Sequence, residues 1–275
     1  MIECSGSVRY NSKIFHVAKE FKTGSMSPFA DTRFLFGSLS KHRRLLFEMA
    51  RRDVSDRYAG QMLGAIWAIV HPVMTILVFI FIFAVVFGVK VESQMNIPGD
   101  HTLYMLAGLV PWLIIADVLA RSTTIVSNQA SLVKQVVFPV EILPVKMVLA
   151  SLPTFVIGFA GMAIYGIAVG RVGSAMMLYP LAALPLYLFL LGVAFALSAI
   201  GVFLRDVREL VQMYILVGMY VAPIVYFMDW VPERLRFIVY MNPITVFIET
   251  FHDAAYFGGI RSWLIWLIAL GMGCL

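Results

Sequence analysis

Three ionisable side chains lie close together near the C-terminal end of the chain. Glu249, His252 and Asp253 occur in the stretch ETFHDAAYFGG. Residues three or four positions apart share one face of a helix, so Glu249 would lie beside the other two. The group could transfer protons as an acid–base site. The sequence favours a hydrogen-bonded cluster instead, and the catalytic alternative stays open.

Two further acidic residues have a basic residue four positions later. Asp53 precedes Arg57, and Asp117 precedes Arg121. Opposite charges at this spacing on a helix attract each other. The sequence therefore predicts two local ion pairs.

Motifs for self-contained catalysis are absent from the sequence. There is no Gly-Lys dipeptide, so there is no Walker A loop to hold nucleotide phosphates, and no HExxH, CxxC or GxSxG pattern occurs. The two cysteines, Cys4 and Cys274, lie at opposite ends. We expect no enzymatic activity, no cofactor or metal of its own and no nucleic-acid partner.

The composition is that of a membrane protein. Hydrophobic residues make up 61% and charged residues 13% of the 275 residues, whereas soluble domains are about half apolar and about a quarter charged. We expect an all-α integral membrane protein with a cytoplasmic leader over residues 1–61 and a transmembrane domain over 62–275. Six apolar runs predict six transmembrane helices: Met62–Val89, Leu103–Leu119, Val145–Val169, Met176–Leu204, Leu210–Phe227 and Trp263–Leu275. The last run is short for a span, which leads us to expect that it is truncated.

The distribution of basic residues predicts the orientation. Residues 1–62 hold 11 of the 21 Lys and Arg, and five more fall in the other segments assigned to the inner side, namely Arg121, Lys134, Lys146, Arg205 and Arg208. Five fall on the outer side: Lys90, Arg171, Arg234, Arg236 and Arg261. By the positive-inside rule, the N-terminus is cytoplasmic.

Two segments outside the spans have helical patterns. The stretch His42–Tyr58 predicts a basic amphipathic helix that lies on the membrane surface, docks a cytoplasmic partner, or does both. The stretch Met228–Ile260 predicts two short helices between spans 5 and 6. They form either a re-entrant pair or an interfacial hairpin.

The spans are almost free of charge at their centres, so an ion-driven transport mechanism has few residues to use. We expect any transport to draw its energy from another protein. An ion-coupled secondary transporter and a membrane-bound enzyme using Glu249, His252 and Asp253 are the alternatives from other classes.

Five stretches together resemble the permease subunits of ABC exporters of lipid-linked O-antigen and capsular polysaccharides. They are RRDVSDRYAGQMLGAIWAIVHPV (51–73), LAGLVPWLIIADVL (106–119), VSNQASLVKQVVFPVEILPV (126–145), LRDVRELVQMYILVGMYVAPIVY (204–226) and MNPITVFIETF (241–251). One departure is His71, where the family pattern has Asn. The resemblance implies a homodimer in the bacterial inner membrane that works with separate ATP-binding subunits. A related permease for teichoic-acid polymers or hydrophobic small molecules is the alternative within the superfamily.

The resemblance also implies a coupling helix over Asn128–Val137 that fits the ATPase. The residues expected to contact the ATPase are Asn128, Gln129, Leu132, Val133 and Lys134. Aromatic side chains either line a conduit for sugar rings or form the interfacial aromatic belt; they are Trp112, Tyr220, Tyr226, Phe227 and Trp230. The placement of charge predicts that the phosphates of the lipid-linked substrate meet Arg51, Arg52 and Arg57.

Overall fold

The computed structural model describes residues 43–87, 100–129, 140–171 and 173–274, and all regular structure within these ranges is helical. Four helical stretches are long and apolar enough to cross a membrane: Gly64–Val86, His101–Ser122, Ile142–Ala168 and Ala175–Phe203. The predicted all-helical fold is therefore confirmed for the described residues, and four of the helices have the length and composition of membrane spans. The other two predicted spans are the shorter helices α12 (Val207–Val221) and α15 (Trp263–Cys274), whose passage across a membrane stays a prediction.

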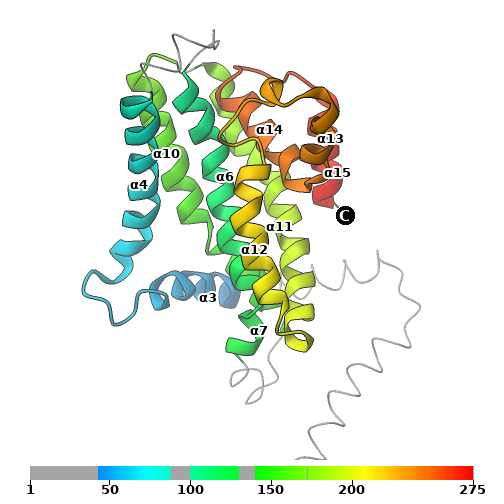
Figure 1. The fold of residues 1–275 in the computed structure, drawn as a ribbon. Helices are drawn as coiled ribbons and strands as arrows, with labels where there is room; N and C mark the ends of the chain where they lie inside the picture. Colours follow the sequence, from blue (N-terminus) through cyan, green and yellow to red (C-terminus); the bar gives the residue numbers. More distant parts are fainter. Residues whose placement is uncertain (1–42, 88–99, 130–139, 172, 275) are drawn as a thin grey trace, which may run out of the picture. The chain divides into compact units, whose positions relative to one another are not determined.

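Helix α6 (His101–Ser122) lies at the centre of the helices (Figure 1). The most apolar window of α6 is 78% buried within the protein, against 11% for Gly64–Val86. The helices that contact α6 are α4 (Trp67–Ile80), α9 (Ile142–Leu149), α10 (Leu152–Ala168), α11 (Leu178–Phe203), α12 and α14 (Pro243–Ala255). A charged residue on α6 is thus within reach of most other elements.

A proline inside α6 is accommodated by a tyrosine from α11. Pro111 has no N–H, so the carbonyl of Ala107 loses its partner within the helix. The fully buried hydroxyl of Tyr179 donates a hydrogen bond to that carbonyl at 3.0 Å. A buried carbonyl without a partner would destabilise the helix, so this bond lets an apolar proline helix form the core.

Glycine residues allow α11 and α12 to approach α6 especially closely. A Cβ atom on Gly218 of α12 would lie 2.8 Å from the ring of Trp112, and one on Gly201 of α11 would collide with the backbone carbonyl of Thr123. Only glycine leaves room for such approaches. The short helix α7 (Ile125–Asn128) follows directly and contacts α9 and α11.

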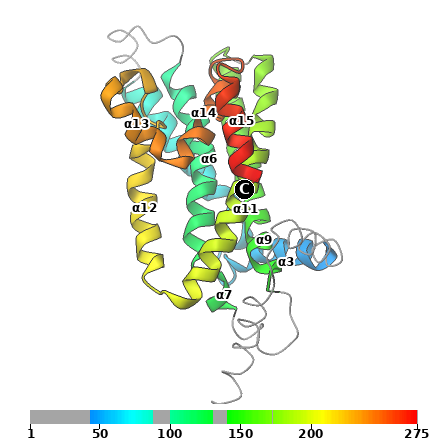
Figure 2. The ribbon, with the colours of Figure 1, turned by 90° about the vertical axis from the view of Figure 1, so that its right-hand side faces the viewer.

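Helix α3 (Arg43–Asp56) runs across the ends of the spans rather than beside them (Figures 1 and 2). Residues 44–275 form one compact unit, so α3 packs with the spans. Its predicted polar face is exposed, and Ala50 on the other face is buried. The amphipathic character predicted for this segment is confirmed.

At the opposite end of the spans lie α13 (Glu233–Met241) and α14, the two short helices expected between spans 5 and 6. The Oδ1 atom of Asn242 accepts a hydrogen bond from the backbone N–H of Ile244 and caps α14. Every residue from Ile244 to Ala255 is buried, so α14 is a core helix. Re-entry into the membrane stays a prediction. Short 3₁₀ and π elements complete the fold: η1 (Gly64–Ile66), η2 (Phe81–Val86), η3 (Ser174–Met177) and η4 (Met228–Trp230).

Candidate functional site

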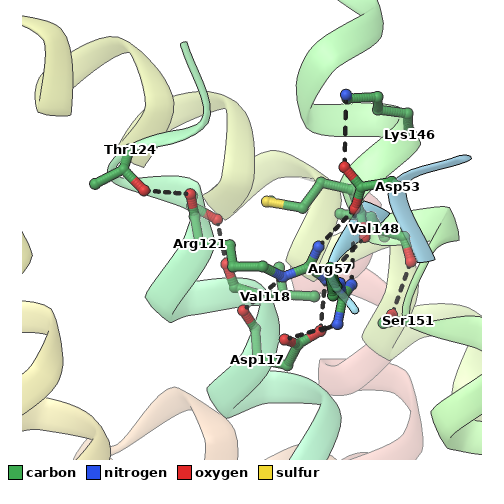
Figure 3. A network of polar contacts seen from close by, with 11 residues as sticks. Asp53, Arg57, Asp117, Val118, Arg121, Thr124, Lys146, Val148 and Ser151 are labelled. Carbon is green, nitrogen blue, oxygen red and sulfur yellow. Dashed lines mark hydrogen bonds and ion pairs between the residues drawn. The ribbon is translucent and has the colours of Figure 1, made fainter. Parts of the chain in front are cut away.

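Five charged side chains from three helical regions meet where α3 crosses the spans (Figure 3). We call this group the α3 cluster; its members are Asp53, Arg57, Asp117, Arg121 and Lys146. Arg121 lies 2.9 Å from Asp53 and 2.5 Å from Asp117. Arg57 lies 3.3 Å from Asp117, and Lys146 lies 3.5 Å from Asp53. The cluster therefore ties α3 to α6 and α9.

Both predicted local pairs exist, since Asp117 contacts Arg121 and Asp53 contacts Arg57 at 3.7 Å. The bonds between helices were not predicted. Arg121 and Asp53 are 68 residues apart, and the spacing of charges along one helix carries no information about a partner so distant in the sequence. The closest indication in the sequence was that these charged residues lie near the predicted inner ends of the spans.

The α3 cluster has one more cation than it has carboxylates. Arg57, Arg121 and Lys146 face Asp53 and Asp117. Nη1 of Arg57 donates to Asp117, but its Nε and Nη2 atoms, although buried, have no hydrogen-bond partner in the described residues. The cluster thus keeps a positive charge and unused donors.

A cavity of about 160 Å³ lies beside this cluster, between α3, α4, α6 and α10. Half of its lining is polar: Arg57, Tyr58, His71, Thr75, Asp117 and Thr154. The rest is apolar: Val54, Ala68, Pro72, Leu113, Ala150 and Pro153. We call it the α3 cavity. Its lining suits a ligand with both a charged and an apolar part.

A second ion cluster, the α14 cluster, lies at the other end of the spans. It consists of Glu249 and Asp253 on α14, Arg261 in the turn that follows, and Trp266 on α15. Arg261 donates to Glu249 at 2.8 Å and to Asp253 at 2.9 Å. The indole N–H of Trp266 donates to Asp253 at 3.2 Å.

The three residues of the predicted acid–base group, namely the two carboxylates of this cluster and the neighbouring His252, are buried. Glu249 is 2% exposed, Asp253 1% and His252 0%. Burial raises the pKa of Glu249 to about 7 against the opposing effect of Arg261, and burial lowers the pKa of His252 to about 3. His252 stacks on Tyr104 with ring centres 3.7 Å apart. Glu249 and Asp253 are bonded through Arg261, whereas the two ring nitrogens of His252 are buried without a hydrogen-bond partner in the described residues. The hydrogen-bonded cluster thus joins the two carboxylates and leaves out the histidine, and the acid–base site stays an alternative prediction.

The predicted conduit aromatics occupy different environments. Trp112 lies near the middle of α6 and is buried against Gly218. Phe227 is buried against Tyr104. Tyr226 lies beyond the end of α12 and donates its hydroxyl to a backbone carbonyl. Large faces remain exposed on Tyr220 (67%) and Trp230 (43%).

The predicted ATPase contacts fall partly outside the described residues. Asn128 is the exposed last residue of α7 and Gln129 follows it, whereas Leu132, Val133 and Lys134 lie in a segment outside the described ranges. The three arginines expected to meet lipid phosphates separate into two groups. Two are exposed on α3, Arg51 and Arg52, and the third is Arg57 of the α3 cluster.

Comparison with known proteins identifies the family. The model of the ABC-2 type transporter family matches residues 44–256, which is more than half of the chain. The chain belongs to the ABC-2 type transporter family, and the resemblance inferred from the five sequence stretches is confirmed.

Two relatives indicate which kind of ABC-2 transporter protein this chain is similar to. The chain is 26% identical over 211 residues to an O-antigen export system permease protein RfbA of Klebsiella pneumoniae, covering 76% of this chain and 79% of the relative. It is 26% identical over 225 residues to the protein of the same name from Myxococcus xanthus, covering 81% and 84%. These relatives are permeases, which are transport components.

Proposed function

We propose that this chain is the transmembrane subunit of an ATP-driven exporter that moves a lipid-linked polysaccharide, such as O-antigen or a capsular glycan, across the bacterial inner membrane. A separate ABC ATPase subunit binds and hydrolyses the ATP. The similarity to O-antigen export permeases over about four fifths of both chains carries the proposal. The absence of a Walker A loop from the sequence agrees with this division of labour.

In the proposed topology the N-terminus is cytoplasmic and the chain crosses the membrane six times. Helices α12 and α15 then complete the spans with contacts from a second copy in a homodimer. The arrangement of the elements supports this orientation, because α3, α7 and the turn before α12 lie at one end of the spans (Figure 2). Basic residues are concentrated in α3 and around the turn before α12, which carries Arg205 and Arg208.

The ATPase would dock at the segment that begins with Asn128 and Gln129 and continues through Leu132, Val133 and Lys134. Support comes from α7, which follows α6 directly and contacts α9 and α11. A displacement of α7 by the ATPase would therefore be transmitted to α6, α9 and α11. Trp112, Tyr220, Tyr226, Phe227 and Trp230 would guide the sugar chain, with the large exposed faces of Tyr220 and Trp230 best suited to stacking.

The proposal is tested by purifying the tagged chain from its host in mild detergent and identifying what accompanies it by mass spectrometry. A stoichiometric ATP-binding subunit is expected, and it should be lost when residues 128–135 are replaced by a Gly/Ser linker. The same replacement over residues 91–98, on the opposite predicted side of the membrane, is the control. A well-folded chain that never retains an ATPase would contradict the proposal and favour the ion-coupled alternative.

A further inference from the structure

The α3 cavity combines a surplus positive charge, unused hydrogen-bond donors and an apolar wall. We propose that it binds the phosphate group of a membrane lipid, with the lipid's apolar part leaving between α3 and α4. The inference refines the prediction that Arg57 meets lipid phosphates, and it rests on the proposed function for the placement of α3 at the membrane surface.

Charge favours an anion in this cavity. Asp117 also lines it, but both of its carboxylate oxygens accept hydrogen bonds from arginines, Arg57 and Arg121. With Lys146 held by Asp53, the three cations of the cluster are opposed by two carboxylates. Asp56, the other acidic residue near Lys146, is exposed to solvent. One negative charge would balance the site.

The Arg57 N–H groups that make no hydrogen bond favour phosphate over other anions. Buried Nε of Arg57 has no partner in the described residues, and Nη2 makes no hydrogen bond there but faces Asp53 at an ion-pair distance of 3.7 Å. Buried donors without hydrogen bonds are uncommon in folded proteins. An arginine fork that offers two adjacent N–H groups suits two phosphate oxygens. The side chains of His71 and Thr154 line the same cavity and could make further polar contacts, whereas the Thr75 hydroxyl already donates to the His71 carbonyl at 2.9 Å.

Position and size favour a lipid phosphate over free phosphate. The cavity of about 160 Å³ has room for a phosphate group but not for a sugar chain. One side is formed by α3, an amphipathic helix across the ends of the spans, where lipid headgroups lie. Ala68 and Pro72 of α4 provide an apolar wall for the glycerol or prenyl carbons.

The test measures lipid binding to the purified full-length chain by native mass spectrometry in detergent, apart from any transport assay. Three probes are compared: phosphatidylglycerol, a polyprenyl phosphate and diacylglycerol. Ala68→Leu fills the cavity without changing charge, and Ala65→Leu at an exposed neighbouring position is its control. Arg57→Gln removes the fork, and Arg44→Gln on the exposed face of α3 makes the same charge change outside the cavity.

We expect both phosphate lipids to bind and diacylglycerol to bind weakly. Arg57→Gln should lower affinity by about tenfold or more, the effect of losing a charge-assisted hydrogen bond. Ala68→Leu should lower it at least as much because its side chain occupies the space of the phosphate, while both controls retain affinity. Preference for polyprenyl phosphate would mark a substrate site, and equal binding would mark a structural phospholipid site. Equal binding of diacylglycerol, or unchanged binding in Ala68→Leu, would overturn the inference. Because binding is measured without the ATPase, that result would leave the proposed export function to its own test.

Discussion

The two ion clusters use the same chemistry with opposite charge balance. In the α3 cluster, three cations from α3, α6 and α9 surround two carboxylates, and the segments involved are far apart in sequence. In the α14 cluster, two carboxylates share one cation, and Arg261 is only 12 residues from Glu249. The first cluster joins separate helices, and the second fixes a local turn between α14 and α15.

This difference predicts unequal effects for equal mutations. Removing one arginine from the α3 cluster leaves two cations for two carboxylates. Removing Arg261 leaves two almost fully buried carboxylates without their cation. The number of charges that remain unpaired should therefore decide the cost, rather than the number of bonds that are broken.

The largest effect is expected for Arg261→Gln. It should lower the free energy of unfolding by about 3 kcal/mol at pH 8, because an unpaired buried charge is costly. The loss should be smaller at pH 5, where protonation neutralises Glu249. Thermal unfolding in detergent at both pH values measures this, with exposed Arg234→Gln as the control. A loss that is independent of pH would show that bond geometry, not charge, stabilises the turn.

Arg121→Gln should have a smaller effect, about 2 kcal/mol, although Arg121 contacts two carboxylates. Arg57 and Lys146 remain to balance them. A double-mutant cycle with Asp53→Asn, followed by the same unfolding assay, should give a coupling of about 1 kcal/mol across the α3–α6 contact. If Arg121→Gln cost more than Arg261→Gln, the comparison of charge balance would fail.

Apolar runs in the sequence located most of the helices but not their ends. The run Leu210–Phe227 is apolar apart from Gln212 and continues to Phe227, yet α12 ends at Val221. Pro223 was the available signal, because proline lacks an N–H and disfavours helical geometry in the residue before it. An apolar sequence alone does not show whether a helix continues or is followed by an extended segment that packs against the core.

The environment of α14 and of Arg57 was harder to predict. The apolar face of α14 suited a membrane interface and a protein core equally, and packing against α6, α11 and α15 decided for the core. For Arg57 the sequence predicted a pair with Asp53 and a role toward lipid phosphates, and it gave no indication of the contact with Asp117, 60 residues away, which depends on how α3 folds back onto α6. Such contacts are tertiary and leave no periodic signal in one sequence.

Glu249→Gln should change the pH dependence of stability more than stability itself. The pKa of Glu249 is raised to about 7 from 4.5, so the folded protein binds a proton that the unfolded chain releases between these values. Its contribution to stability is present below about pH 4.5 and is lost as the pH rises through 7. The amide of the glutamine variant would mimic the protonated carboxyl group. The stability of the variant relative to the wild type should therefore increase as the pH rises from about 5 to about 8.

The wild type itself combines two opposing slopes in this range, because the lowered pKa of His252 makes stability fall as pH drops below 6.5. Comparing Glu249→Gln with the wild type at each pH isolates the glutamate. Identical pH profiles of the melting temperature would show that Arg261 keeps Glu249 ionised throughout, and the α14 cluster would then carry a net negative charge at neutral pH.

The smallest effect is expected for Lys146→Met, which is the sharpest test of surplus charge in the α3 cluster. The Lys146 side chain is 4% exposed, and its single ion pair with Asp53 is 3.5 Å long. Methionine has a similar length, fills the same space and removes a buried charge that the cluster does not need, since Arg121 still pairs with Asp53. The free energy of unfolding should change by less than about 1 kcal/mol, in either direction. A loss as large as that of Arg261→Gln would mean that Lys146 compensates a carboxylate that no other cation reaches, and the proposed anion in the α3 cavity would lose its electrostatic basis.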